Sequence, residues 1–143
     1  MINIPLVEHF SSFEIISLGI DVEDISRFRK HILQERQSLL LNDLFTADEL
    51  HCYSRDFNHF IPLGFVFKEA MFKAIGESWN TNTVDWKEIV FIPPWENFQG
   101  SLKVSGKVDE IFNEKFIHAI YGHCFTKDEA AICEVLLLSD PSK

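Results

Sequence analysis

The sequence has few of the residues that mark specialised classes of protein. Its 143 residues include three cysteines, six glycines and five prolines, and no internal repeat or low-complexity segment is visible. The cysteines, Cys52, Cys124 and Cys133, are odd in number and widely spaced, which indicates neither a zinc site nor a disulfide scaffold. We therefore expect reduced cysteines and a cytoplasmic protein.

Long apolar runs and excess positive charge are also lacking. No run reaches the roughly 18–20 residues that span a bilayer, and residues 1–9 lack a basic segment followed by an apolar stretch, so we expect no membrane span and no signal peptide. The formal net charge of −9 argues against a nucleic-acid-binding protein. Apolar residues make up 46% of the chain and include fourteen Phe, which predicts one globular domain with a core rich in rings.

The most informative stretch present is residues 65–76, Phe-Val-Phe-Lys-Glu-Ala-Met-Phe-Lys-Ala-Ile-Gly, which we predict to be the end of a buried helix. At about 100° per residue, Glu69 shares a face with large phenylalanines and with Lys73. A carboxylate among phenyl rings is costly unless a cation or strong hydrogen bonds compensate its charge. Lys68 and Lys73 flank it with room for a metal, which suits a polyphosphate. A helix edge with an ordinary Glu–Lys pair is the alternative.

A strand predicted over residues 13–22 supplies a second carboxylate. One face of this strand is mostly apolar, while the other ends on Ser17, Gly19 and Asp21. The small residues are expected to leave space for a ligand beside Asp21. The alternative is that Asp21 only ends the strand or caps the next helix.

The next segment, residues 23–37, is predicted to be a helix with a local positive charge. Between residues 27 and 36 it carries four basic residues and one Glu, on a chain that is acidic as a whole. Such a helix fits an acidic partner or a phosphate ligand, and a solvated charged face is the alternative. The basic residues are Arg27, Arg29, Lys30 and Arg36.

The other patterns complete an α+β domain with a mainly antiparallel sheet packed against a long helix. A Thr46–Glu49 capping box opens a short helix, and Pro62 suits the first turn of the long helix that ends near Gly76. Later strands are predicted over residues 86–92, 101–104, 116–124 and 130–138, with a helix after Ser105. We place the domain at residues 13–139, an N-terminal extension at 1–12 and a tail at 140–143.

Two segments together resemble the holo-acyl-carrier-protein synthase type of 4′-phosphopantetheinyl transferase. Residues 19–28, Gly-Ile-Asp-Val-Glu-Asp-Ile-Ser-Arg-Phe, are similar to the family's Gly-x-Asp pattern followed six residues later by Arg. Residues 67–76 are similar to its Lys-Glu-Ala-x-x-Lys-Ala motif. Residues 44–49 resemble its Thr-x-x-Glu helix start, and the likeness extends from about residue 15 to 136.

The resemblance implies a magnesium-dependent phosphoryl transfer in which a serine of an apo acyl carrier protein attacks the β-phosphate of coenzyme A. Asp21 and Glu69 would be the Mg²⁺ ligands, which agrees with the one or two carboxylates that magnesium takes beside phosphate oxygens and waters. Arg27, Lys68 and Lys73 would hold phosphates. Asp21, Glu69 and Lys73 would therefore carry the catalysis.

The resemblance also implies partners. An acidic carrier protein of a fatty-acid, polyketide or peptide pathway would dock on Arg27, Arg29, Lys30 and Arg36. His123 is expected near the adenine nucleotide. The protein is expected to be a homotrimer with active sites between subunits.

Three points stay open at the level of sequence. The general base is Glu69, a metal-bound water or Glu23. Gly64 stands where the family usually has Arg, and Gly122 stands where it has Ser before the histidine. The transferase remains the main hypothesis; these two departures are the support for the alternative of a non-catalytic relative that docks a carrier protein, and an unrelated α+β domain is the remaining alternative.

Overall fold

The computed structural model describes residues 1–30, 37–76, 84–94 and 100–143. The strands are β1 (Ile2–Ile4), β2 (Glu14–Asp24), β3 (Ile89–Ile92), β4 (Ser101–Val104), β5 (Ala119–Lys127) and β6 (Ala130–Ser139). The α-helices are α1 (Ile25–Phe28), α2 (Gln37–Leu44), α3 (Ala47–Tyr53), α4 (Phe57–Ile75) and α5 (Gly106–Glu114). Two 3₁₀ turns, η2 (Ser54–Asp56) and η4 (Trp86–Glu88), precede α4 and β3.

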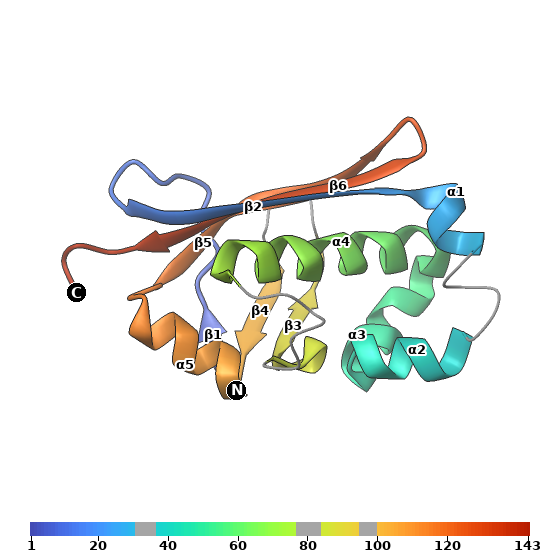
Figure 1. Ribbon diagram of the computed structural model, residues 1–143, viewed down its shortest axis with the longest axis horizontal. Coiled ribbons are helices and arrows are strands. Elements are labelled where there is room, and N and C mark those ends of the chain that lie inside the picture. The colour runs from blue at the N-terminus through green and yellow to red at the C-terminus, as the bar shows by residue number, and fades with distance from the viewer. Residues whose placement is uncertain (31–36, 77–83, 95–99) are drawn as a thin grey trace.

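The strands form two antiparallel three-stranded sheets, with the orders β2-β6-β5 and β1-β4-β3. Helix α4 lies along one face of the β2-β6-β5 sheet, and the shorter sheet and helices α2, α3 and α5 lie below α4 in Figure 1. This arrangement confirms the predicted α+β fold with an antiparallel sheet on a long helix. The difference is that the strands divide between two sheets instead of joining one.

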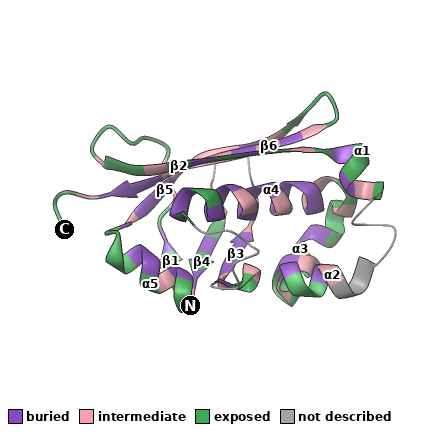
Figure 2. Cartoon of the chain, viewed as in Figure 1, coloured by how far each residue is buried: buried purple, intermediate pink, exposed green. Residues whose placement is uncertain are grey.

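Helix α4 is the centre of the core, and its residues from 61 onward are mostly buried (Figure 2). It ends, as predicted, at Gly76, whose φ of 79° is left-handed. It begins at Phe57, so Pro62 lies in its second turn and not, as predicted, in its first. Because Pro62 has no N–H, it cannot donate to the carbonyl of Asn58 one turn earlier; the Arg29 Nη2 donates to that oxygen at 3.2 Å instead.

Strand β2 runs unusually close to α4. A Cβ atom at Gly19 would collide with the carbonyl oxygen of Ala70, and Ser17 Oγ donates to the carbonyl oxygen of Ala74 at 2.6 Å. The prediction that Ser17 and Gly19 leave space for a ligand is therefore wrong, because the helix backbone fills that space. Their small size instead permits the close approach of strand and helix.

The first residues of the chain connect the two sheets. Strand β1 pairs with β4, and the chain then passes the edge of β5, where Pro5 O accepts from Ile120 N and Val7 N donates to Ile120 O, both at 3.0 Å. Phe10 then packs on Tyr121 with 4.8 Å between ring centroids. The domain boundary at residue 12 stays a prediction.

Three local expectations differ from the structure. Residues 86–88 form η4, so the strand predicted over 86–92 begins only at Ile89. The helix predicted over 23–37 is described only as α1, since residues 31–36 lie outside the described part. Cys124 and Cys133 face each other across β5 and β6 and form a disulfide, against the expectation of reduced cysteines, because their strands are joined by a tight hairpin.

No helix of the described residues is long and apolar enough to cross a membrane.

Candidate active site

Three predicted site residues come together where β2 crosses α4. Lys73 Nζ donates to Asp21 Oδ1 at 2.7 Å and to the carbonyl oxygen of Ile20 at 3.2 Å. The Asp21 side chain is 9% exposed and that of Lys73 is 53% exposed. Glu69, half-buried, lies one helical turn before Lys73 on the same side of α4. Two segments about fifty residues apart in sequence thus build one acidic site with a cation at its rim.

The local sequence explains how the site forms. Alternation along β2 turns Gly19 and Asp21 to the face that packs on α4, while Ile20 and Val22 face outward. Because Gly19 has no side chain, the strand lies directly on the helix and Asp21 reaches Lys73. Asp24 then caps α1 by accepting from Arg27 N at 3.0 Å, so Asp24, not Asp21, is the helix cap.

The carboxylates of the site repel one another and are partly desolvated. Burial, and then the charge of Asp21, raises the pKa of Glu69 to about 7, against the opposing effect of Lys73. Burial and Asp21 also raise the pKa of Glu23, and Arg27 lowers it in part. The hydrogen bond to Asp21 raises the pKa of Lys73, which is therefore a firmly charged cation. Excess negative charge in a partly buried cluster of this kind favours an added cation.

The chemistry of the cluster fits a magnesium ion. Asp21 Oδ2 is buried and has no hydrogen-bond partner, so one carboxylate oxygen of the site is left unsatisfied. Among the described residues, no group of three or more His, Cys, Asp or Glu side chains is placed to hold a metal by itself. Magnesium, however, commonly takes only one or two carboxylates and completes its shell with phosphate oxygens and water. Asp21 and Glu69 are the residues that would hold it.

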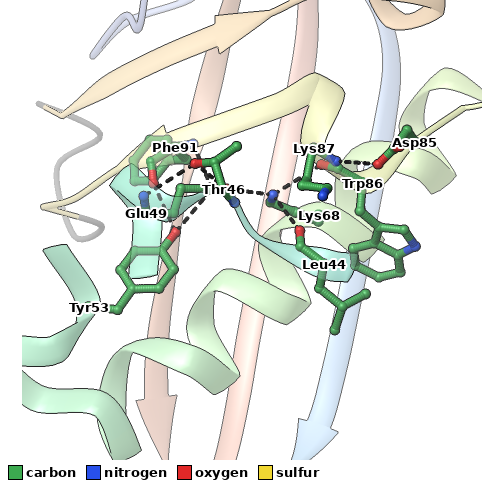
Figure 3. Close-up of polar contacts among 9 residues, drawn as sticks. All are labelled: Leu44, Thr46, Glu49, Tyr53, Lys68, Asp85, Trp86, Lys87 and Phe91. Carbon is green, nitrogen blue, oxygen red and sulfur yellow. Dashed lines mark hydrogen bonds and ion pairs between the residues drawn. The ribbon is translucent and has the colours of Figure 1, made fainter. Parts of the chain in front are cut away.

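Lys68 lies apart from this cluster although it precedes Glu69 in the chain. Its ammonium donates to Glu49 Oε1 at 2.9 Å, to the carbonyl oxygen of Leu44 at 2.8 Å and to that of Trp86 at 3.0 Å (Figure 3). The side chains of Lys68 and Glu49 are both 0% exposed. All three ammonium protons are therefore used inside the protein, and burial lowers the pKa of Lys68 against the effect of Glu49. The predicted phosphate contact from Lys68 is wrong, because its ammonium has neither a free donor nor access to solvent.

Glu49 is a residue whose importance the sequence analysis missed. Its predicted capping box is present: Thr46 Oγ1 accepts from Glu49 N, and Glu49 Oε1 accepts from Thr46 N. Its second oxygen accepts from Phe91 N at 3.1 Å and lies 3.3 Å from the hydroxyl of Tyr53. Burial and Glu49 raise the pKa of Tyr53 well above its usual value. A buried Glu is stable only when a cation pairs with it, so the capping Glu49 could have been predicted to pair with a buried lysine such as Lys68.

The predicted docking residues are only partly described. Arg27 and Lys30 are exposed at α1, whereas Arg29 is half-buried and bonds the Asn58 carbonyl oxygen freed by Pro62. Arg36 lies outside the described residues.

His123 is not brought to the Asp21 cluster within one chain. Its neighbour Cys124 is buried toward α4, so strand alternation places His123 on the opposite face of the sheet. There its Nδ1 lies 3.5 Å from Glu134 Oε1, and its ring stacks on Phe125 with 5.1 Å between centroids.

The two glycines that depart from the family pattern are both tightly enclosed. A Cβ at Gly64 would lie 3.0 Å from a ring atom of Phe45 and 3.1 Å from one of Tyr53. A Cβ at Gly122 would collide with the carbonyl oxygen of Glu134 on β6. Larger side chains at either position require the neighbouring elements to shift.

This cluster and the fold around it match one group of known proteins. The sequence model of the 4′-phosphopantetheinyl transferase superfamily matches residues 17–112, and the chain belongs to this superfamily. Among its relatives, the holo-[acyl-carrier-protein] synthase of Geotalea daltonii is 31% identical over 110 residues, which cover 75% of this chain and 85% of the relative. The enzyme of the same name from Trichlorobacter lovleyi is 32% identical over 103 residues, or 71% and 79% of the two chains.

Solved structures show the same fold. The acyl carrier protein synthase of Plasmodium yoelii with ADP bound has a TM-score of 0.73 at 16% identity, covering 90% of this chain and 98% of the other. The holo-[acyl-carrier-protein] synthase of Helicobacter pylori in complex with coenzyme A has a TM-score of 0.67 at 20% identity, covering 85% and 99%.

Proposed function

We propose that this protein transfers 4′-phosphopantetheine from coenzyme A to a serine of an apo acyl carrier protein in a magnesium-dependent reaction. The observation that supports this most is the Asp21–Lys73 contact of 2.7 Å beside Glu69, in a chain of the 4′-phosphopantetheinyl transferase superfamily. Relatives at 31% and 32% identity carry the name holo-[acyl-carrier-protein] synthase.

The side chains suit the steps of this reaction. The serine oxygen bonds to the β-phosphorus of coenzyme A, the bond from that phosphorus to the bridging oxygen breaks, and adenosine 3′,5′-bisphosphate leaves. Glu69, Glu23 and a metal-bound water are the candidates to accept the serine proton. Lys73 and Arg27 counter the charge that develops on the leaving phosphate. When bound by Asp21 and Glu69, Mg²⁺ supplies charge neutralisation at the diphosphate.

Docking of an acidic carrier protein on α1 is part of the same proposal. Arg27 and Lys30 are exposed there on a chain with a net charge of −9, so the positive charge of this segment is opposite to that of the chain as a whole. A local positive surface steers an acidic partner toward the adjacent Asp21 site. Arg29 and Arg36 are included from the sequence, although Arg29 also holds the Asn58 carbonyl oxygen.

We also propose that the protein is a homotrimer with its active sites between subunits. The face of the β2-β6-β5 sheet that points away from α4 carries large exposed apolar side chains along β2. On β2 these are Ile16, Leu18, Ile20 and Val22, which are 38–56% exposed. An apolar stripe of this size favours a protein interface. His123 lies on this face, so its predicted place near the nucleotide is a site completed by a neighbouring copy.

The deciding experiment combines the protein with coenzyme A, Mg²⁺ and apo carrier proteins from fatty-acid, polyketide and peptide pathways. Intact-mass measurement should show one added phosphopantetheine on at least one carrier, and chelation of the metal should abolish the gain. Docking without any mass gain would instead favour the non-catalytic relative, for which the enclosed Gly64 and Gly122 are the specific observations. Light scattering of wild-type and Leu18→Glu protein would test the trimer, and cell fractionation would test the cytoplasmic location.

A further inference from the structure

The buried Lys68 does more than neutralise Glu49. Its three hydrogen bonds end on three different elements: the last residue of α2, the first turn of α3, and η4. Glu49 alone would satisfy the charge of the ammonium. The 3.0 Å bond to the carbonyl oxygen of Trp86 additionally ties η4 to the middle of α4. Asp85 caps the start of the same turn, since its Oδ1 accepts from Lys87 N at 2.8 Å (Figure 3).

The turn fixed in this way carries the Trp86 indole, which packs on two phenylalanines of α4. Its ring stacks on Phe65 with 5.3 Å between centroids and 23° between planes. It meets Phe72 edge-on at 5.0 Å and 87°. These two positions lie four residues before and three residues after Glu69, so they flank it on one helix face.

Angular positions on α4 place this aromatic group between the two charged regions. At 100° per residue, Lys68 and Glu69 stand on opposite sides of the line that joins Phe65 to Phe72. The indole that contacts both rings therefore lies, by angle around α4, between the positions of Lys68 and Glu69. Packing against such rigid rings restricts the rotamers open to a neighbouring side chain.

We propose that Lys68 is a positioning residue: it seats Trp86 between Phe65 and Phe72, and the resulting aromatic wall holds Glu69 in its working position. This inference rests on the proposed function for the role of Glu69, but the contact between Lys68 and Trp86 is independent of it. Lys68 acts through the wall and touches no substrate.

The first experiment tests the packing of Trp86 by fluorescence, without any activity measurement. Replacing Trp79 and Trp95 by Phe leaves Trp86 as the only indole of the chain. In that background, the Glu49→Leu/Lys68→Met double variant removes both buried charges, a replacement that such pairs tolerate. Its Trp86 emission should shift to longer wavelength with lower anisotropy, while Lys87→Met, at an exposed lysine within the same turn, should change neither. A folded double variant with unchanged emission and anisotropy would overturn the role of Lys68.

The second experiment tests, through kcat and KM, how Trp86 affects the function of Glu69. Trp86→Leu keeps the backbone carbonyl that Lys68 binds, and Trp86→Phe also keeps an aromatic ring. For Trp86→Leu we expect kcat to fall about tenfold or more with the KM for coenzyme A within about twofold, because misplacement of a catalytic group affects the chemical step most. Trp86→Phe should restore most of kcat. A folded Trp86→Leu variant with the kcat of the wild type would overturn the proposal that Trp86 positions Glu69. If the wild-type protein shows no transfer, the proposed function is overturned, and the fluorescence experiment alone decides the role of Lys68.

Discussion

Lys68 and Glu69 are consecutive residues, yet they belong to ion clusters of opposite character. The Lys68–Glu49 pair is wholly enclosed, and its ammonium has three acceptors. The Asp21–Lys73 pair is open on the lysine side, and Asp21 Oδ2 has no partner. A satisfied buried pair stabilises one arrangement of the chain, while an incomplete and partly open cluster retains the capacity to bind a ligand. The comparison teaches that the motif Lys-Glu combines a structural residue with a chemical one.

The largest expected effect separates the two clusters by activity. Glu69→Gln removes the charge that would hold a metal or accept a proton, so transfer should fall by about two orders of magnitude or more. The thermal unfolding temperature should not fall below that of the wild type, because no satisfied buried pair is broken. Mass spectrometry of the carrier measures the rate, and Glu110→Gln on the exposed side of α5 is the matched control. Retained turnover would remove Glu69 from its proposed role.

The enclosed pair should show the reverse behaviour. Glu49→Leu leaves the Lys68 ammonium buried without its counter-charge, which should lower the free energy of unfolding by about 3–5 kcal/mol. Adding Lys68→Met should recover most of this loss, as followed by urea unfolding. A Glu49→Leu variant as stable as the wild type would show that the pair does not have the structural role assigned to it.

The close approach of β2 to α4 gives a smaller effect that joins stability to activity. Gly19→Ala places a methyl group on the Ala70 carbonyl oxygen, so it should cost about 1–3 kcal/mol of stability and move Asp21 away from Lys73. The free energy of unfolding, measured in urea, and the transfer rate should both fall. Ile15→Ala, at an exposed position of the same strand, is the control. Normal activity in a destabilised Gly19→Ala variant would mean that the site tolerates displacement of β2.

The raised pKa of Glu69 predicts a pH dependence for the metal-free protein. Burial, followed by Asp21, raises this pKa from 4.5 to about 7. Between these values the folded state binds a proton that the unfolded state has lost, so a rise in pH through 7 charges a half-buried carboxylate and lowers stability. Unfolding of wild type and Glu69→Gln from pH 5 to 8 should therefore show the wild type losing stability relative to the variant. A difference in unfolding free energy between the two proteins that stays constant across this pH range would contradict the raised pKa of Glu69.

The smallest expected effect lies at the rim of the open cluster. Arg27→Ala should raise the KM for an acidic carrier protein severalfold, and added salt should shrink the difference because exposed charges are screened. Arg55→Ala, an exposed arginine of η2, should have little effect. Equal effects of the two substitutions would remove the specific docking role of α1.

Local patterns were enough to predict much of this molecule. The place of strand β2, the Thr46–Glu49 capping box and the end of α4 at Gly76 follow from alternation, helical spacing and capping chemistry, whereas the start of α4 at Phe57 was not predicted. Sequence reasoning could not predict that β2 would lie against α4 at Gly19, because the contact joins positions about fifty residues apart. For the same reason it took the space beside Asp21 to be free for a ligand.

The sequence alone determined that Asp21 shares a strand face with Ser17 and Gly19 and that Glu69 shares a helix face with phenylalanines, since strand and helix periods are local properties of the chain. Only the structure showed that the Asp21 face of β2, and not its more apolar face, packs on α4. It also determined that lysines would stand on both sides of Glu69. Only the tertiary structure decided that Lys68 is enclosed and Lys73 open. That choice depends on Glu49 and Trp86, which reach Lys68 from distant segments, and on β2, which brings Asp21 to Lys73. Burial and pairing are non-local quantities, so the same residue type acquired two different roles on one helix.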